Sequence, residues 1–226
     1  MINFVYFRDF STIFSVFSSI IGEVRQFSKF ATGRPGRLRQ VSIVGQSPLR
    51  QLKGSHELSD SRLKLHQDLG IPDDYASSRD LPEYEQADDL VDVGPNLVGR
   101  MQRLTPEAAA NWQRMVEAAA ADGVRLLIVS GFRSFDYQAE LIKSKINNGQ
   151  TIDEILKVNA APGYSQHHTG GAIDIATPGS RPLTDEFEHS EAFRWLTENA
   201  ISFSFSMTYP RDNRYGFIYE PWHWSQ

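Results

Sequence analysis

Two histidines and an aspartate in the second half of the chain have the types and spacing of a metal site. His167 and Asp174 lie seven residues apart within the run 165–174, Ser-Gln-His-His-Thr-Gly-Gly-Ala-Ile-Asp, and His223 follows 49 residues later. A mononuclear catalytic zinc ion takes three protein ligands from His, Asp, Glu or Cys and keeps an open position for water. Because the chain has no cysteine, nitrogen and oxygen atoms must serve, a set that favours zinc over manganese or iron. We therefore predict one zinc ion held by these three residues.

The residues between His167 and Asp174 allow the two side chains to converge. The Gly170-Gly171 pair permits a sharp turn or a close approach of another segment. Residues 172–176, Ala-Ile-Asp-Ile-Ala, are typical of a short strand, in which Asp174 shares one face with the small Ala172. The carboxylate is thus expected at the surface of a sheet.

A second carboxylate stands beside the third candidate ligand. Glu220 precedes His223 by three residues, and Pro221 between them favours a bend or an edge position, so both side chains can reach one site. A hydrolase needs a carboxylate that takes a proton from water and later returns it to the leaving amine. Glu220 is our candidate for this base.

The two patterns together, Ser-x-His-x-x-Gly-x-Ala-x-Asp and Glu-x-Trp-His, resemble those of the zinc D-alanyl-D-alanine carboxypeptidases and dipeptidases, the VanY-like group. Their fold is shared with the Hedgehog signalling domain. The resemblance implies that His167, Asp174 and His223 are zinc ligands, that Glu220 is the catalytic base, and that Ser165 is a nearby supporting residue.

The resemblance extends to the run 130–138, Ser-Gly-Phe-Arg-Ser-Phe-Asp-Tyr-Gln, where family members carry a similar S-x-x-R-S-x-x-x-Q pattern. It implies that Arg133, Ser134 and Gln138 line the substrate site. An exopeptidase must recognise a free C-terminal carboxylate, and a planar guanidinium binds a carboxylate through two parallel hydrogen bonds. We expect Arg133 to have this role.

The neighbouring His168 is the alternative ligand, because adjacent histidines can exchange roles if the register shifts. The motif spacing favours His167 and leaves His168 to line the pocket or to bond a neighbour. The other histidines, His56, His66 and His189, are expected to be surface or core residues. Trp222 and Trp224 are expected in the core, without a chemical role.

The element pattern predicts an α+β domain over residues 61–226, a small mainly antiparallel sheet with helices packed against it. The Thr105-Pro106 pair marks a helix start, and Thr151 with Glu154 forms a capping box. Residues 71–92 are expected to be an acidic loop that wraps the surface or covers part of the active-site face. Helices are predicted at 63–69, 106–122, 136–145, 151–158 and 185–200, and strands at 124–130 (central in the sheet), 172–176, 203–205 and 216–219.

Residues 1–60 are predicted to be a separate region, an amphipathic helix followed by a flexible basic linker. Residues 1–30 hold seven of the fourteen phenylalanines, several at spacings of three and four, which is typical of an amphipathic helix. Residues 25–53 carry seven basic and no acidic side chains. The region could contact a membrane surface through residues 1–53, pack on the domain, or have little role. Polar interruptions argue against a membrane span, and a signal peptide pattern is not evident.

The net charge of −5 over 226 residues argues against nucleic acid as a partner, and we expect a monomer. The resemblance implies a zinc carboxypeptidase that removes the terminal D-alanine of peptidoglycan stem peptides. Alternatives are an L,D-carboxypeptidase, a D,D-dipeptidase, an endolysin-like peptidase, or a non-catalytic zinc-stabilised binding module; the presence of Glu220 favours an enzyme. The substrate class implies the cell envelope or periplasm, with the cytoplasm left open.

Overall fold

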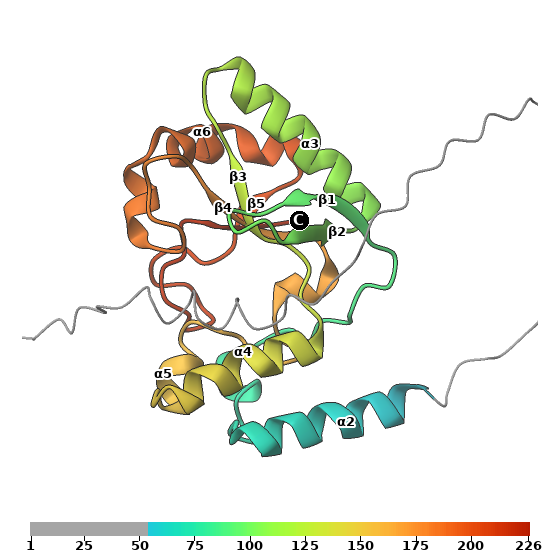
Figure 1. The fold of residues 1–226 in the computed structure, drawn as a ribbon. Helices are drawn as coiled ribbons and strands as arrows, with labels where there is room; N and C mark the ends of the chain where they lie inside the picture. Colours follow the sequence, from blue (N-terminus) through green and yellow to red (C-terminus); the bar gives the residue numbers. More distant parts are fainter. Residues whose placement is uncertain (1–53) are drawn as a thin grey trace, which may run out of the picture. The chain divides into compact units, whose positions relative to one another are not determined.

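The structure, a computed structural model, describes residues 54–226, which fall within one compact unit. It is an α+β arrangement in which helices pack around a small antiparallel sheet (Figure 1). This confirms the expected fold class. The amphipathic helix and basic linker predicted for residues 1–53 lie outside the described residues.

The main sheet has four strands in the spatial order β3-β4-β6-β5, all antiparallel. Its strands are β3 (Leu127–Ser130), β4 (Ala172–Ala176), β6 (His223–Ser225) and β5 (Ser206–Met207). In the register of this sheet, Asp174 of β4 lies opposite His223 of β6 and also opposite Ser130 of β3. The sheet therefore brings two of the three candidate ligands into one cross-strand pair.

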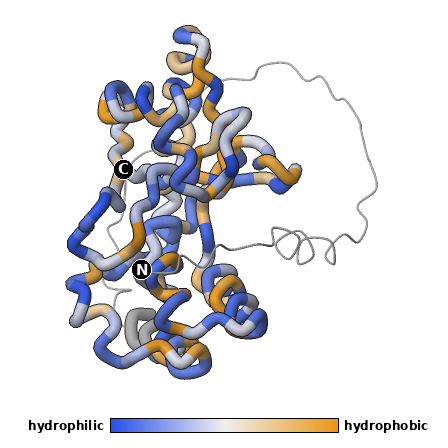
Figure 2. Tube along the Cα trace, turned by 90° about the vertical axis from the view of Figure 1, so that its left-hand side faces the viewer, coloured by the Kyte–Doolittle hydropathy of each residue, from blue (hydrophilic) through white to orange (hydrophobic). Residues whose placement is uncertain are grey.

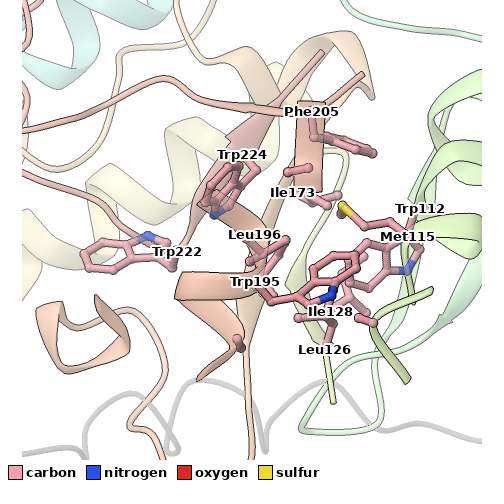
Figure 3. Packing of buried hydrophobic residues seen from close by; sticks show 14 of the residues in the cluster. Trp112, Met115, Leu126, Ile128, Ile173, Trp195, Leu196, Phe205, Trp222 and Trp224 are labelled. Carbon is pink, nitrogen blue, oxygen red and sulfur yellow. The ribbon is translucent and has the colours of Figure 1, made fainter. Parts of the chain in front are cut away.

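The largest hydrophobic core lies between this sheet and the helices α3 (Pro106–Ala121) and α6 (Glu191–Asn199) (Figure 3). The α3 helix begins where predicted, with Thr105 at its N-cap accepting a hydrogen bond from the Ala108 amide. Burial of large side chains stabilises such a core by about 1.5–3 kcal/mol for each one. The buried large side chains of this core include Trp112, Met115, Ile128, Ile173, Trp195, Leu196, Phe205 and Trp224.

A second, smaller cluster joins the helices on the other side of the sheet in Figure 1, namely α2 (Gly54–Leu69), α4 (Phe135–Asn147) and α5 (Ile152–Ile155). The predicted capping box of α5 is present, since Thr151 and Glu154 bond each other's backbone amides. The α2 helix is longer than the predicted 63–69 and crosses the boundary expected between residues 60 and 61. Short 3-10 helices complete the described part, η2 (Ser77–Arg79), η3 (Gln166–Thr169), η4 (Asp185–His189) and η5 (Ala200–Phe203).

The prediction that residues 124–130 form a central strand was wrong, because β3 lies at the edge of its sheet. A hairpin that was not predicted, β1 (Val91–Pro95) and β2 (Met101–Leu104), covers this edge. The Asn96 amide donates to the Val129 carbonyl oxygen (3.0 Å), and the Phe132 amide donates to the Arg103 carbonyl oxygen (2.8 Å). An edge strand covered in this way carries the apolar sequence of an interior strand.

The strands predicted at 203–205 and 216–219 were also wrong. Ser204 adopts a left-handed backbone conformation (φ +64°) at the end of η5, and Gly216 does so in the loop before Glu220 (φ +69°). These conformations interrupt an extended chain, so the strands form at 206–207 and 223–225 instead.

Among the described helices none is both long and apolar enough to cross a membrane. Hydrophobic and hydrophilic residues follow one another at short intervals along this part of the chain (Figure 2).

Candidate metal centre

The three predicted ligands converge in the interior. His167 lies in η3, Asp174 in β4 and His223 in β6, and one ligand atom from each lies within 4.8 Å of the others. His167 Nε2 is 3.3 Å from Asp174 Oδ2, and His223 Nδ1 is 3.0 Å from Asp174 Oδ1. Separations of this size are those between neighbouring ligand atoms around one zinc ion, whose bonds are about 2.0–2.2 Å long. All three residues are buried.

The backbone places His167 by means of a glycine. Gly170 ends η3 with φ +67°, and a Cβ at this position would lie 3.0 Å from the Leu90 side chain and 3.2 Å from the Thr105 amide nitrogen. Only glycine fits this combination of conformation and close approach. The turn then leads into β4, so His167 folds back toward Asp174.

The hydrogen bonds of His167 prepare its Nε2 atom for a metal. Its Nδ1 atom lies 2.7 Å from the Gly131 carbonyl oxygen, which can only accept, so Nδ1 carries the proton. Nε2 is buried and makes no hydrogen bond. Burial lowers the pKa of the His167 imidazole to about 4, and the Arg133 guanidinium acts in the same direction. A neutral imidazole with an unpartnered, inward-facing nitrogen is the state that binds a metal ion, so the donor set fits zinc.

His168, the alternative ligand, has both ring nitrogens engaged. Its Nδ1–H donates to the Arg133 carbonyl oxygen (2.6 Å), and its Nε2 accepts the Gly163 amide (3.1 Å). Burial lowers its pKa to about 4 as well. The fully buried ring also packs edge-on against Phe135. His168 therefore joins two loops and has no free nitrogen to offer.

Asp174 is ionised in this setting. Burial opposes its ionisation, but the neighbouring His167 and His223 rings and the positive charge of Arg133 hold the pKa of the carboxyl well below its usual value. The Arg133 guanidinium contacts this carboxylate, with its Nη2 2.7 Å from Asp174 Oδ2.

Glu220 shows the opposite behaviour. Burial raises its pKa well above the usual value, the nearby negative charge of Asp174 adds to this, and Arg133 and Lys145 oppose it. Glu220 as a whole is 7% exposed. A turn joins it to the third ligand, since the His223 amide donates to the Glu220 carbonyl oxygen (3.1 Å). The predicted bend at Pro221 thus brings Glu220 and His223 to one cavity.

That cavity has a volume of about 30 Å³, enough for about one water molecule. Its wall unites most of the predicted site residues with several that sequence reasoning missed: Arg133, Gln138, Val158, Asn159, Ala160, Ser165, His167, Tyr209, Phe217, Glu220 and His223. A larger hollow of about 530 Å³ lies around Val124 and Thr177. Because it contains none of the titratable residues that converge here, we assign the chemistry to the smaller cavity.

Arg133 is held by three side chains. Its Nε donates to Ser130 Oγ (3.0 Å), Nη1 to Gln138 Oε1 (3.4 Å) and Nη2 to Asp174 Oδ2. Gln138 is fully buried and donates to the Ala160 carbonyl oxygen (2.8 Å). The Ser134 hydroxyl caps α4 by accepting the Tyr137 amide (3.1 Å), and its predicted place in the substrate site stays a prediction.

Two residues that the sequence did not single out contact His223. The Tyr209 ring stacks on the His223 ring with 4.8 Å between centroids, and burial raises the pKa of its hydroxyl strongly. The Oε1 atom of Gln166 lies 2.8 Å from His223 Nε2, within hydrogen-bond distance. Gln166 stands beside His167 in the motif, but no feature of its type or spacing points to this contact.

A buried group of two histidines and one aspartate, with a glutamate beside it, is the donor arrangement of mononuclear metallohydrolases. Comparison with known proteins gives the family. The profile of VanY, described as D-alanyl-D-alanine carboxypeptidase, matches residues 101–226. The chain belongs to this family.

Individual relatives agree with this assignment. YodJ of Bacillus subtilis (strain 168) is 32% identical over 156 residues, which are 63% of this chain and 55% of YodJ. A D-alanyl-D-alanine carboxypeptidase of Enterococcus faecalis (strain ATCC 700802 / V583) is 31% identical over 143 residues, 59% of this chain and 52% of that protein. The chain thus spans about half the length of these curated relatives. The solved structure of the LdcB LD-carboxypeptidase superposes with a TM-score of 0.56 at 30% identity, covering 64% of this chain and 70% of LdcB.

Proposed function

We propose that the protein is a zinc-dependent D-alanyl-D-alanine carboxypeptidase that hydrolyses the terminal D-alanine from peptidoglycan stem peptides. The observation that carries the proposal is the unpartnered Nε2 of His167, which faces Asp174 in the cavity that Glu220 and His223 also line. Membership of the VanY family supports the choice of reaction.

In this proposal His167, Asp174 and His223 hold the zinc ion. When bound, zinc polarises the scissile carbonyl and makes water a stronger acid. Glu220 would be ionised with the ion bound, because a positive charge in the same cavity favours the carboxylate form over the protonated one. Ionised Glu220 takes a proton from the attacking water as the new C–O bond forms. It returns the proton to the amine nitrogen as the C–N bond breaks, releasing D-alanine.

Arg133 supplies the positive charge of the site. A guanidinium has five N–H donors, and its contacts with Ser130, Gln138 and Asp174 use three. The remaining donors can bind a substrate carboxylate or the oxygen on which negative charge develops. We propose Ser165 and Gln138 as further walls of the substrate site, since both are buried and line the cavity.

An L,D-carboxypeptidase is the second candidate, and the similarity to the LdcB LD-carboxypeptidase favours it. The two reactions differ in the configuration of the residue before the scissile bond. Either substrate places the protein in the cell envelope, and we propose this location on that ground.

The test is incubation of the full chain with purified muropeptides, followed by mass spectrometry. Loss of one alanine from a pentapeptide ending in D-Ala-D-Ala, abolished by a chelator, restored by zinc and absent in Glu220→Gln, supports the proposal. Loss of alanine only from the tetrapeptide, in which D-alanine follows an L-centre, identifies the L,D-enzyme. Stoichiometric zinc with no turnover of either peptide contradicts both and identifies a binding module.

A further inference from the structure

One amide side chain in the wall of the small cavity has a fixed orientation. Asn159 follows α5 and lines the cavity together with Glu220 and Arg133. Its Oδ1 atom lies 2.5 Å from Nζ of Lys145, which belongs to α4. An ammonium group has three N–H donors and no acceptor, so the atom that faces Lys145 is the amide oxygen. The Nδ2 group, with its two N–H donors, therefore points away from Lys145.

The backbone on both sides of this amide is held by hydrogen bonds. The Asn159 backbone amide donates to the carbonyl oxygen of Ile155 (2.7 Å), the last residue of α5. The carbonyl oxygen of the next residue, Ala160, accepts from the buried Gln138 side chain (2.8 Å). With the backbone fixed, Lys145 determines which end of the Asn159 amide is presented to the cavity.

The Nδ2 donors of Asn159 are available to a ligand. Within residues 54–226, Nδ2 makes no hydrogen bond and is not fully buried. The adjoining Val158 lines the same cavity and is 37% exposed, so this wall reaches the surface. Two N–H donors on such a wall are suited to an oxygen atom of a bound molecule.

Lys145 stands behind Asn159 and is not part of the cavity wall. Burial lowers the pKa of its ammonium group, Arg133 acts in the same direction, and Glu220 opposes the change. Lys145 is thus within reach of the charges of the site but meets the cavity through Asn159. A hydrogen bond from a cation to an amide oxygen also polarises the amide and strengthens its N–H groups as donors.

We propose that Asn159 is a substrate-binding residue that donates from Nδ2 to an oxygen atom of the stem peptide, and that Lys145 is a positioning residue that orients the Asn159 amide. The proposal rests on the proposed function and adds a specificity contact to it. The acceptor is a backbone carbonyl oxygen or a side-chain carboxylate of the peptide, since both accept N–H donors. The experiment separates these two sources.

Peptide binding is measured by titration calorimetry of the zinc-loaded full chain carrying Glu220→Gln, so that the peptide is not turned over. In this background Asn159→Leu keeps the size of the side chain and removes its donors. We expect affinity for the pentapeptide to fall about 3–10-fold, the effect of one neutral hydrogen bond. Asn159→Asp keeps an oxygen for Lys145 but has no donor, and it should weaken binding at least as much. A residue that only joined α4 to the loop would tolerate aspartate without loss.

The role of Lys145 is tested through its dependence on Asn159. Lys145→Met frees the amide to rotate and should weaken binding about 2–5-fold, but it should have no further effect when Asn159 is already leucine. Lys145→Arg again offers only donors and should restore the parent affinity. Lys143→Met is the matched control, because this lysine of the same helix is 61% exposed and pairs with Glu140; it should bind like the parent.

Two pentapeptides identify the acceptor, one with and one without a carboxylate in the side chain of the third residue. Equal losses with both peptides assign the contact to a backbone carbonyl oxygen. A loss confined to the peptide with the extra carboxylate assigns it to that group.

Parent-like binding by Asn159→Leu and Asn159→Asp, or an effect of Lys145→Met that persists unchanged beside Asn159→Leu, would overturn the proposal. Absence of peptide binding in Glu220→Gln together with absence of turnover in the parent would instead overturn the proposed function. Thermal unfolding shows which variants are folded. If Asn159→Leu is not, Asn159→Asp provides the test, because it retains an acceptor for Lys145.

Discussion

The adjacent histidines, His167 and His168, should differ in what their replacement by alanine changes most, either the stability of the protein or its metal binding. His168 has both nitrogens bonded to backbone groups, whereas His167 has one bonded nitrogen and one that faces the metal position. We therefore expect His168→Ala to destabilise the metal-free protein more, and His167→Ala to weaken zinc binding more.

The magnitudes follow from the contacts. In His168→Ala, the Gly163 amide and the Arg133 carbonyl lose their partner, and each unsatisfied buried group costs about 1–3 kcal/mol. Loss of the ring packed on Phe135 adds a cavity, so we expect a total of about 3–5 kcal/mol. His167→Ala leaves only the Gly131 carbonyl unpaired and should cost about 1–2 kcal/mol. Loss of a ligand should weaken zinc binding more than about 100-fold, beyond the effect of losing an outer partner.

Urea unfolding of the metal-free variants, followed by tryptophan fluorescence, measures the first quantity. Competition with a chelator measures the second. His189→Ala is the matched control, because its side chain is 80% exposed, and it should change neither. Equal loss of zinc in His167→Ala and His168→Ala would refute the ligand assignment, and a smaller destabilisation by His168→Ala than by His167→Ala would refute the role of its hydrogen bonds.

Three further changes have defined outcomes. The pKa of Glu220 is raised in the folded protein, so protonation of Glu220 stabilises the metal-free fold below pH 4.5, and this stabilisation is lost as pH rises toward the raised pKa. Glu220→Gln does not titrate, and its unfolding free energy relative to that of the parent should therefore increase over that pH range. A difference that stays constant with pH would contradict the burial argument. Gly170→Ala should destabilise the protein by about 2–4 kcal/mol and reduce zinc binding, because a Cβ at this position would meet Leu90 and Thr105. Urea unfolding like that of the parent would show that the loop adapts and would contradict this expectation. Ser204→Gly should stabilise the protein by about 0.5–1 kcal/mol, because the exposed Ser204 has φ +64°. The strain of a non-glycine residue in the left-handed conformation exceeds the extra backbone entropy that glycine loses on folding. A lower midpoint of thermal unfolding would refute this.

Local signals in the sequence located the helices best. Thr105 with Pro106, and Thr151 with Glu154, satisfy backbone groups within one turn, so their effect does not depend on distant residues. The convergence of His167, Asp174 and His223 was also predictable, because the types of the three residues limit what they can do together. Their roles as ligands, and the roles of Glu220 and Arg133, remain proposals.

The failures share a physical cause, which is contact with distant segments. The edge position of β3 depends on the hairpin β1–β2, whose Asn96 and Arg103 cover it. The short strands β5 and β6 exist only as partners in the sheet, and residues 216–219 resemble a strand without having one to pair with. Gln166 and Tyr209 could not be identified as neighbours of His223, because neither their spacing nor their type distinguishes them from ordinary loop residues.

The position of β6 between β4 and β5 has a consequence for the order of folding. Four contacts that assemble the site join residues far apart in sequence: 36 between His167 and Gly131, 41 between Arg133 and Asp174, 49 between His223 and Asp174, and 57 between His223 and Gln166. Loops of this length close slowly, because the chain loses conformational entropy before the contacts that stabilise the closed loop can form. The three donors therefore come together only as the sheet is completed, and a bound ion would hold the finished sheet against reopening by mass action. In a refolding experiment, uptake of zinc should accompany the last phase and would report the native fraction rather than an early collapsed state.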